Sequence, residues 1–398
     1  MSAGEHTAFF VLLAALLAPL LAQTPVAARL PVVVLEVLLG MAVGPHALGW
    51  IDATPFLKQM MAIGTTAVLF MAGMEVDFEL IRGRPLLLAV AWWLLALTVA
   101  VGSVAVLHVV PDVDAPMMVA LALVTTGLGL LPRMLRESGK LATAYGRLLL
   151  AAGTVGQVAP AVAVALTLSP RYNAAHEFAF LFAFLVLVVA AVVAGVGVRP
   201  PRLIALLTRT LNASTQLPIR LTLVVVGGFL VLSNKLGLEG VLGALAAGMV
   251  VGRASRDAEA EPFRIKLDAI SFGFLTPFFF VGTGASFDLT AMTRDLPTML
   301  LVPTFLLLFL VVHGLPMVLY RPQLALHERL SFSLSVSVAS LALVAVIAEV
   351  GHHHRGVNAD TAQALVAAAL LSMLVFPTFA ALLASWRARA APTPGPSV

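Results

Sequence analysis

Long apolar segments recur along the whole chain and are separated by short stretches that carry Gly, Pro and charged residues. A helix that crosses a lipid bilayer needs about 20 predominantly apolar residues. The predicted spans are residues 7–22, 30–49, 57–76, 86–110, 115–135, 142–168, 176–198, 217–234, 238–252, 265–285, 296–319, 329–350 and 361–386. The pattern therefore predicts an all-α polytopic membrane protein with about 13 transmembrane helices.

Polar and helix-breaking residues interrupt the fifth and sixth spans. Unwound backbone and a primary amide at bilayer depth cost free energy unless they are buried in protein or line a wet cavity. We therefore expect one polar cluster that both spans share, with residues 337–340 of the twelfth span opposite it. The interrupting residues are Thr125, Thr126 and Gly127 in the fifth span, and Gly156, Gln157 and Pro160 in the sixth.

Composition agrees with a membrane protein and excludes some chemistry. Hydrophobic residues make up 60% of the chain and charged residues only 11%, whereas soluble domains carry roughly 25% charged residues. The absence of cysteine excludes disulfides and thiolate metal sites. The pI of about 9.8 does not indicate a nucleic-acid partner, because the basic residues lie in short loops between the spans.

Those basic residues predict the orientation. Eighteen Lys and Arg residues lie in the loops after odd-numbered spans and in the C-terminal tail, against five in the opposite loops. Lys and Arg accumulate on the cytoplasmic side of membrane proteins. The N-terminus is therefore expected outside the cell and the C-terminus in the cytoplasm.

An internal repeat is visible in the sequence. The segment LEVLLG at residues 35–40 recurs as LEGVLG at 238–243, an offset of 203, and LFMAG at 69–73 resembles FFFVG at 278–282, an offset of 209. Seven spans separate each pair, and an odd number inverts the second copy in the membrane. The predicted organisation is a first six-helix repeat at 1–168, a linking helix and loop at 169–216, an inverted second repeat at 217–386 and a short tail at 387–398. Spans 4–6 and 11–13 are expected to form one layer, and spans 1–3 and 8–10 another.

Several motifs occur in a fixed order along the chain: Arg29-Leu-Pro, Glu36, Gly40, Gly44-Pro45, Ala72-Gly73-Met74-Glu75-Val76-Asp77, Leu242-Gly243-Ala244 and Pro277-Phe278-Phe279-Phe280. This series resembles the monovalent cation:proton antiporter family 2, the bacterial sodium/proton and potassium/proton exchangers. The resemblance implies an inverted-repeat fold with two broken, crossing helices (spans 5 and 12), and monovalent cation (Na⁺ or K⁺)/proton antiport by alternating access in a multi-pass protein of the bacterial inner membrane. The layer of spans 1–3 and 8–10 is expected to mediate a homodimer. No GxSxG, HExxH or P-loop pattern occurs, so we expect neither an enzyme nor a cofactor or resident metal.

Two positions depart from that family's pattern. Where the family shows an ion-binding carboxylate this chain has Gln157, and where many members show Lys or Arg it has His313. An amide cannot be deprotonated and brings no countercharge, so Gln157 cannot exchange a proton for a cation. An imidazole titrates near neutral pH. His313 is therefore either the proton carrier or a structural histidine that is hydrogen-bonded to a backbone carbonyl. The ion and proton site is expected to contain Gln157, His313, Thr125, Thr126 and Gly156.

Four acids are possible accessories to that site. Glu36 and its counterpart Glu239 are expected to stabilise packing between the repeats, and Glu349 to lie at the external mouth beside the crossing. Glu75, with Asp77, is expected to be solvated or to pair with Arg82 and Arg84. Trp92 and Trp93 indicate an interfacial aromatic belt. The adjacent His352, His353 and His354 do not predict a metal site, because three consecutive side chains cannot all face one ion.

Two other functions remain open from the sequence. The loss of both charged partners is also compatible with a transport-inactive sensor or assembly partner. An uncharged amide and imidazole pair would suit a transporter of a neutral or anionic solute.

Overall fold

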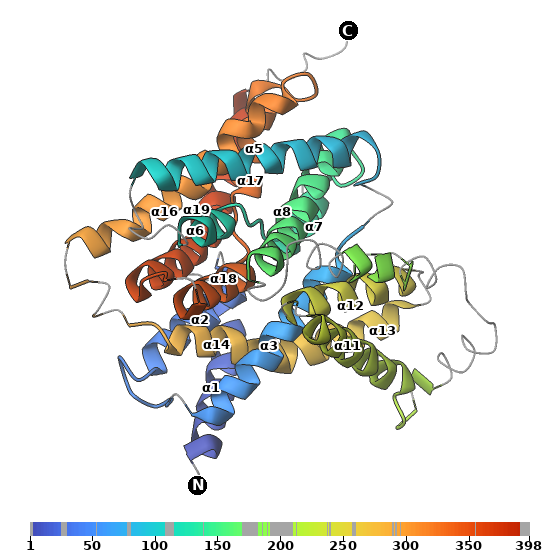
Figure 1. The fold of residues 1–398 in the computed structure, drawn as a ribbon, viewed down its shortest axis with the longest axis vertical. Coiled ribbons are helices and arrows are strands. Elements are labelled where there is room, and N and C mark those ends of the chain that lie inside the picture. Colours follow the sequence, from blue (N-terminus) through green and yellow to red (C-terminus); the bar gives the residue numbers. More distant parts are fainter. Residues whose placement is uncertain are drawn as a thin grey trace. The chain divides into compact units, whose positions relative to one another are not determined.

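The computed structural model describes residues 3–390 with some gaps. The residues left out of this range are 25–29, 53, 78–80, 108–114, 138, 169–181, 185, 189, 192–209, 212, 237, 239, 257–259, 289, 291–292, 295 and 355. Every regular element in the described part of the chain is helical (Figure 1). The expected all-α class is confirmed.

The chain forms two compact units, each built from two separate stretches. Unit 1 comprises Met1–Phe78 and Val158–Thr290, and unit 2 comprises Glu79–Gln157 and Ala291–Val398. Helix α8 (Ala144–Leu168) contributes to both, because the division falls after Gln157. Spans 1–3 thus group with 8–10, and spans 4–6 with 11–13, as expected for the two layers. The boundaries of the two sequence repeats remain a prediction.

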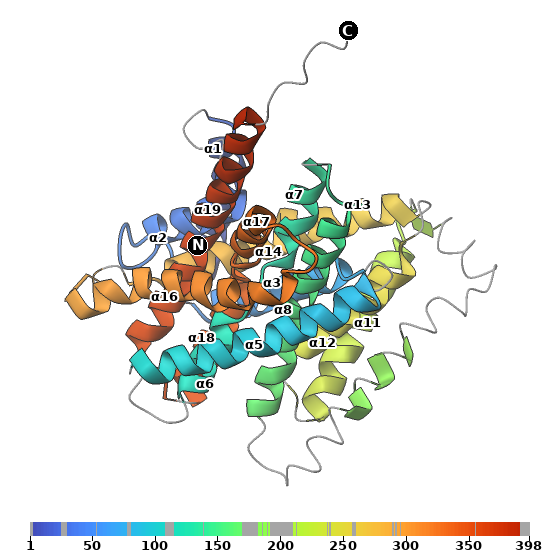
Figure 2. The same cartoon turned by 90° about the horizontal axis from the view of Figure 1, so that it is seen from above.

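Eight further helical elements of unit 1 have both ends among the described residues. They are α1 (Ala3–Ala22), α2 (Val32–Val43), α3 (Pro55–Met74), α11 (Leu217–Lys235), α12 (Gly240–Ala254), α13 (Glu261–Ile270), the π-helical segment η3 (Ser271–Leu275) and α14 (Thr276–Ala285). Unit 2 contains α5 (Arg84–Leu107), α6 (Ala115–Leu123), η1 (Leu128–Leu130), α7 (Leu131–Glu137), α16 (Leu296–Gly314), η4 (Leu315–Tyr320), α17 (Leu326–Val336), α18 (Leu341–His354) and α19 (Ala359–Ala390). In unit 2, α5 packs along α16 (Figure 2).

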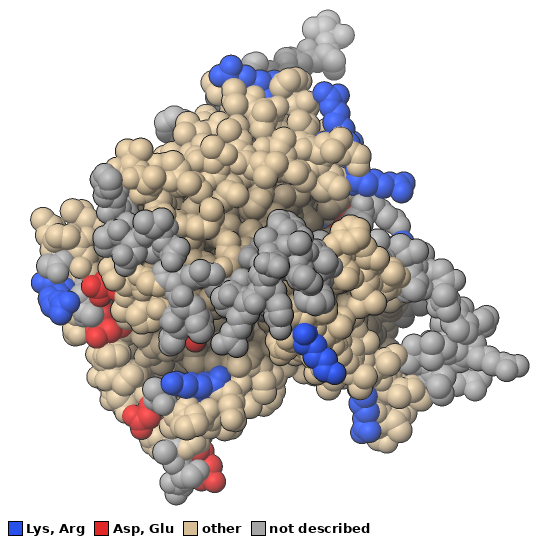
Figure 3. All heavy atoms as spheres, viewed as in Figure 1, with Lys and Arg blue, Asp and Glu red and all other residues tan. Residues whose placement is uncertain are grey.

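The helices suit a bilayer in length and surface. Eight of the described helices are long and apolar enough to cross a membrane, or nine if the bent pair α17 and α18 counts as one span. Charged side chains are few on the face shown in Figure 3, and large apolar side chains such as Leu223 and Val224 of α11 are exposed. The predicted total of thirteen remains a prediction. Helices α2 and α12 are short, and the predicted span at 176–198 lies largely outside the described residues.

Glycines allow two pairs of helices in unit 1 to touch through their backbones. Helix α2 packs against α14, and α3 against α12. A Cβ added at Gly40 would lie 2.2 Å from the Val281 carbonyl oxygen, and one at Gly248 would lie 2.0 Å from the Phe70 carbonyl oxygen. Only glycine permits such an approach, which is a common way for membrane helices to gain close packing.

The glycine contacts define how the two repeats correspond. Three glycine contacts between α2 and α14 have counterparts between α12 and α3, so that Gly40 matches Gly248 (248 − 40 = 208) and Gly73 matches Gly284 (284 − 73 = 211). These offsets differ from the 203 and 209 expected from the sequence. The expected values align similar sequence segments, whereas the observed values align the glycines at which the helix backbones touch. The sequences GMAVG at 40–44 and GMVVG at 248–252 agree with the new register. The matching contacts are Gly40–Val281 with Gly248–Phe70, Val37–Gly284 with Leu245–Gly73, and Gly44–Ala285 with Gly252–Met74.

An aspartate follows each of the matched helices α3 and α14. Asp77 and Asp288 are equivalent in the second offset (288 − 77 = 211). Asp77 forms a salt bridge with Arg256, which also donates a hydrogen bond to the Val76 carbonyl. This arginine is a partner that the sequence analysis did not name.

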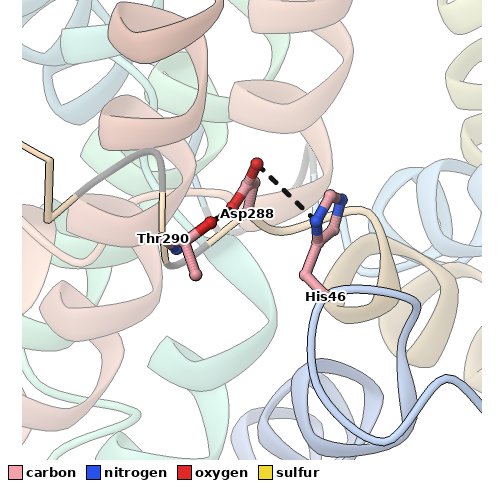
Figure 4. Close-up of polar contacts among 3 residues, drawn as sticks. All are labelled: His46, Asp288 and Thr290. Atoms are coloured by element: carbon pink, nitrogen blue, oxygen red, sulfur yellow. Dashed lines mark hydrogen bonds and ion pairs between the residues drawn. The ribbon is translucent and has the colours of Figure 1, made fainter.

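Asp288 forms the corresponding pair with a histidine. His46 Nδ1 lies 3.6 Å from the Asp288 carboxylate, which also accepts hydrogen bonds from the Thr290 amide and hydroxyl at 3.0 and 2.6 Å (Figure 4). Each carboxylate therefore meets a basic side chain from the segment after α12 or α2. The two glycine-lined helix pairs end in the same arrangement.

We expect Gly248→Ala to destabilise unit 1. Its methyl group would overlap the Phe70 carbonyl, and overpacking of this kind costs about 1–3 kcal/mol. The measurement is the melting temperature of detergent-purified protein. Gly228→Ala in α11 is the matched control, because no atom lies within 4 Å of its added Cβ. Equal melting temperatures for the two variants would contradict the close packing of α3 and α12.

Candidate functional site

The fifth span is interrupted where the sequence predicts. Helix α6 ends at Leu123, and the backbone of residues 124–127 leaves the helix before η1 begins. The Thr126 amide donates to the Gly156 carbonyl of α8 at 2.9 Å, and the Gly127 amide donates to the Val338 carbonyl at 2.7 Å. Backbone donors that the helix no longer satisfies are therefore satisfied by two other segments of unit 2.

The twelfth span is interrupted at the position that receives this bond. Helix α17 ends at Val336, α18 begins at Leu341, and their axes bend by 54°. The Ala339 amide donates to Ser372 Oγ of α19 at 3.0 Å. Because Gly127 contacts Val338 directly, the expectation of two broken helices that cross is confirmed.

Helix α16 places an imidazole at this crossing. His313 is fully buried, and its Nδ1 lies 2.8 Å from the Phe309 carbonyl oxygen one turn earlier. Its Nε2 lies 3.4 Å from Thr126 Oγ1, whose hydroxyl donates to the Val336 carbonyl at 2.9 Å. A single chain of polar contacts therefore joins α16 to both interruptions.

Gly156 provides the space for Thr126. A Cβ added at Gly156 would lie 2.5 Å from Thr126 Oγ1. The next residue, Gln157, is buried with 2% of its surface exposed. The hydrogen bonds of the described residues join Thr126 to Gly156 and His313 and do not include the Gln157 amide. The Thr125 hydroxyl donates to the Ala122 carbonyl in the last turn of α6 at 2.8 Å. Thr126 thus contacts both Gly156 and His313 directly, whereas Thr125 and Gln157 are buried next to these residues in the sequence.

The accessory acids lie in several places. Glu36 is buried in α2 and Glu75 is half-buried at the end of α3, both in unit 1. Glu349 is exposed on α18 of unit 2. Glu239 lies outside the described residues. Among the described residues, no group of three or more His, Asp and Glu side chains is placed to hold a metal ion.

Trp92 is a site residue that the sequence analysis missed. The expectation of an interfacial position is wrong, because Trp92 is fully buried and its Nε1 donates to the His313 carbonyl at 3.3 Å. The rings of Trp92 and His313 lie 5.5 Å apart between centroids. A signal was present in the sequence, since Ala89, Ala96 and Ala100 share its helix face and small residues mark closely packed faces.

The fold and this crossing define a membrane protein in which two interrupted helices are joined by a backbone hydrogen bond at their interruptions. Residues 12–386 match the family described as "Sodium/hydrogen exchanger, transmembrane". The chain belongs to this family, whose members are transporters and not enzymes.

Curated relatives carry related names. The chain is 23% identical over 387 residues to the "Putative Na(+)/H(+) antiporter YjbQ" of Bacillus subtilis, a match that covers 92% of this chain and 61% of that protein. It is 26% identical over 257 residues to the "Na(+)/H(+)-K(+) antiporter GerN" of Bacillus cereus, with 64% and 65% covered. The chain thus spans less than two thirds of the length of these relatives.

A solved structure has the same fold. The sodium proton antiporter MjNhaP1 from Methanocaldococcus jannaschii, determined at pH 8, superposes with a TM-score of 0.66 at 19% sequence identity. The match covers 95% of this chain and 97% of that chain. The inverted-repeat antiporter-like architecture is therefore confirmed.

We expect Gly156→Ala to destabilise the protein more than Gly153→Ala in the same helix. The Gly156 methyl group would meet Thr126, whose amide and hydroxyl are both held by hydrogen bonds. The Gly153 methyl group would meet the end of the flexible Leu131 side chain at 2.4 Å. Melting temperatures in detergent measure the difference, for which about 1–3 kcal/mol is the usual cost of overpacking. A Gly153 variant that is equally or more destabilised would show that Thr126 is free to move.

Proposed function

We propose that this protein exchanges a monovalent cation, Na⁺ or K⁺, for protons by alternating access, with His313 as the proton carrier. The family and the names of the relatives support the class of transport. The observation that carries the proposal is the position of His313 at the crossing. Among the buried described residues of unit 2, it is the only histidine, and an unperturbed imidazole changes its charge near neutral pH.

A histidine can couple the two fluxes without a carboxylate. The cation would be held by backbone carbonyls of the interrupted helices, the Thr126 hydroxyl oxygen and the carbonyl oxygen of Gln157, which are neutral oxygen ligands. Two unit charges about 4 Å apart repel by about 4 kcal/mol at an effective dielectric constant of 20. A protonated His313 would therefore expel the cation, and a neutral one would admit it.

The same proposal includes the environment of the protein. We place it in a bacterial inner membrane as a homodimer, with the N-terminus outside and the C-terminus in the cytoplasm. The distribution of Lys and Arg among the loops supports this orientation. The accessory acids have no assigned step in the exchange.

Flux in proteoliposomes tests the proposal. The purified protein is reconstituted with a pH-sensitive dye inside, and Na⁺, K⁺, Li⁺ or a neutral osmolyte is added outside. We expect proton movement that depends on one or more of the cations. A protein that moves no protons with any cation would support the sensor or assembly role, and proton movement with a neutral or anionic solute alone would support the third function.

We expect His313→Ala to abolish cation-driven proton flux, because it removes the proposed proton carrier. The pH dependence of the wild-type flux should follow a single titrating group, an imidazole and not a carboxylate. His327→Ala, at the start of α17, is the matched control and should keep the wild-type flux. Retained proton flux in folded His313→Ala protein would show that another group carries the proton.

We expect Gln157→Glu to increase cation/proton exchange. The change is nearly isosteric, so the packing of α8 should tolerate it, and it adds an oxygen ligand that can bind either a proton or a cation. The measurement is the initial rate of Na⁺- or K⁺-dependent proton release in the same vesicles. Gln59→Glu, exposed near the start of α3, controls for the added charge. A folded Gln157→Glu protein without any gain would place the ion site elsewhere.

A further inference from the structure

The hydrogen-bond partners of His313 and Thr126 determine where their hydrogen atoms lie. A carbonyl oxygen only accepts, so the 2.8 Å contact with Phe309 requires the hydrogen on His313 Nδ1. The Thr126 hydroxyl has one hydrogen, and the shorter of its two contacts points it at the Val336 carbonyl, at 2.9 Å against 3.4 Å to His313 Nε2. In this arrangement the Thr126 oxygen offers only lone pairs to Nε2.

This contact is satisfied in one protonation state of the imidazole. If His313 is protonated on both nitrogens, Nε2 donates to Thr126 Oγ1, Thr126 donates to Val336, and every group has a partner. If His313 is neutral, the lone pair of Nε2 faces the lone pairs of the hydroxyl. The contact then becomes favourable only when the Thr126 hydroxyl turns its hydrogen to Nε2 and releases Val336.

The released carbonyl of Val336 lies at a helix end, where no donor of its own helix is available. Val336 is the last residue of α17, and the last carbonyls of a helix have no donor within that helix. Without the Thr126 hydrogen, this oxygen is available to another donor or to a cation. It lies at the start of the interruption that contacts Gly127.

We propose that Thr126 is a positioning residue that couples the proton on His313 to the Val336 carbonyl. Loss of the proton breaks the Nε2–H bond, the proton leaves to solvent, and the Thr126 O–H group rotates toward Nε2 without being broken. The Val336 oxygen is thereby freed as a cation ligand in the same step that removes the positive charge. The inference rests on the proposed role of His313 and adds the residue that transmits its charge state.

The surroundings of His313 present no competing charge among the described residues. Its ring contacts Trp92 of α5, Thr126 and Phe309, and Ser333 of α17 lies beside the next residue, Gly314. The titratable groups of the neighbouring elements are engaged elsewhere or lie at helix ends. The rings of Tyr145 of α8 and Tyr320 of η4 contact the ring of Phe332. The others are Arg84 at the start of α5, Arg147 in the first turn of α8, His327, Glu328 and Arg329 in the first turn of α17, and Asp360 in the first turn and Arg387 and Arg389 near the end of α19.

The test compares Thr126→Val with Thr126→Ser in the full-length protein. Valine keeps the shape but removes both bonds to Nε2, the one that the protonated imidazole donates and the one that the neutral imidazole accepts. The first is charge-assisted and roughly twice as strong as the second, so the protonated form loses more and needs a higher proton concentration to form. We expect the midpoint of the pH profile to fall by about 1 pH unit in Thr126→Val. In Thr126→Ser, which keeps the hydroxyl, it should remain near the wild-type value. Thr222→Val is the matched control, because that buried hydroxyl also donates to a carbonyl, that of Pro218 in α11. Its midpoint should equal that of the wild type.

Two readouts separate this inference from the proposed function. One is the flux midpoint in vesicles, and the other is the titration of the His313 side-chain nitrogens by ¹⁵N NMR, assigned by their loss in His313→Gln. A shifted NMR midpoint in Thr126→Val supports the coupling even if no flux is found, in which case the transport proposal fails alone. An unshifted NMR midpoint in Thr126→Val, or an equal shift in Thr126→Ser, overturns the coupling while transport stands. If Thr126→Val does not fold, Thr126→Ala takes its place with the same expected shift.

Discussion

The structure of unit 2 depends on the requirement that every backbone polar group at bilayer depth has a partner. Lipid provides no donor or acceptor, so a span can be interrupted only where another segment satisfies the opened groups. Here the two interruptions satisfy each other, through the bond from the Gly127 amide to the Val338 carbonyl. Helices α8 and α19 satisfy further opened groups through Gly156 and Ser372, and the side chains of Thr126 and His313 meet at the crossing.

Unit 1 satisfies a different constraint in a different way. Its helices have few polar side chains to pair, and apolar surface gains little from leaving lipid for protein, so association relies on close contact. The glycines of α2, α3, α12 and α14 bring backbones together. Unit 1 thus gains its stability from contact between backbones, and the crossing in unit 2 is held by directed hydrogen bonds.

Much of the fold could be predicted from the sequence, because segment length and helix-breaking residues act locally. The break at Thr125, Thr126 and Gly127 follows from local propensity alone. Contacts between distant segments could not be predicted in this way, and Thr126 and His313 are 187 residues apart. An apolar helix also gives little sign of which face turns inward, so Trp92 was assigned to the membrane interface. The repeat was recognised, but in a Leu-, Val- and Gly-rich chain its register became clear only from the glycine contacts.

The two matched aspartates differ in the basic side chain with which each is paired. Arg256 keeps its charge at every physiological pH, whereas His46 attracts Asp288 as an ion only when it is protonated. A duplication that is symmetric in position has in this way paired one aspartate with a permanent cation and the other with an imidazole.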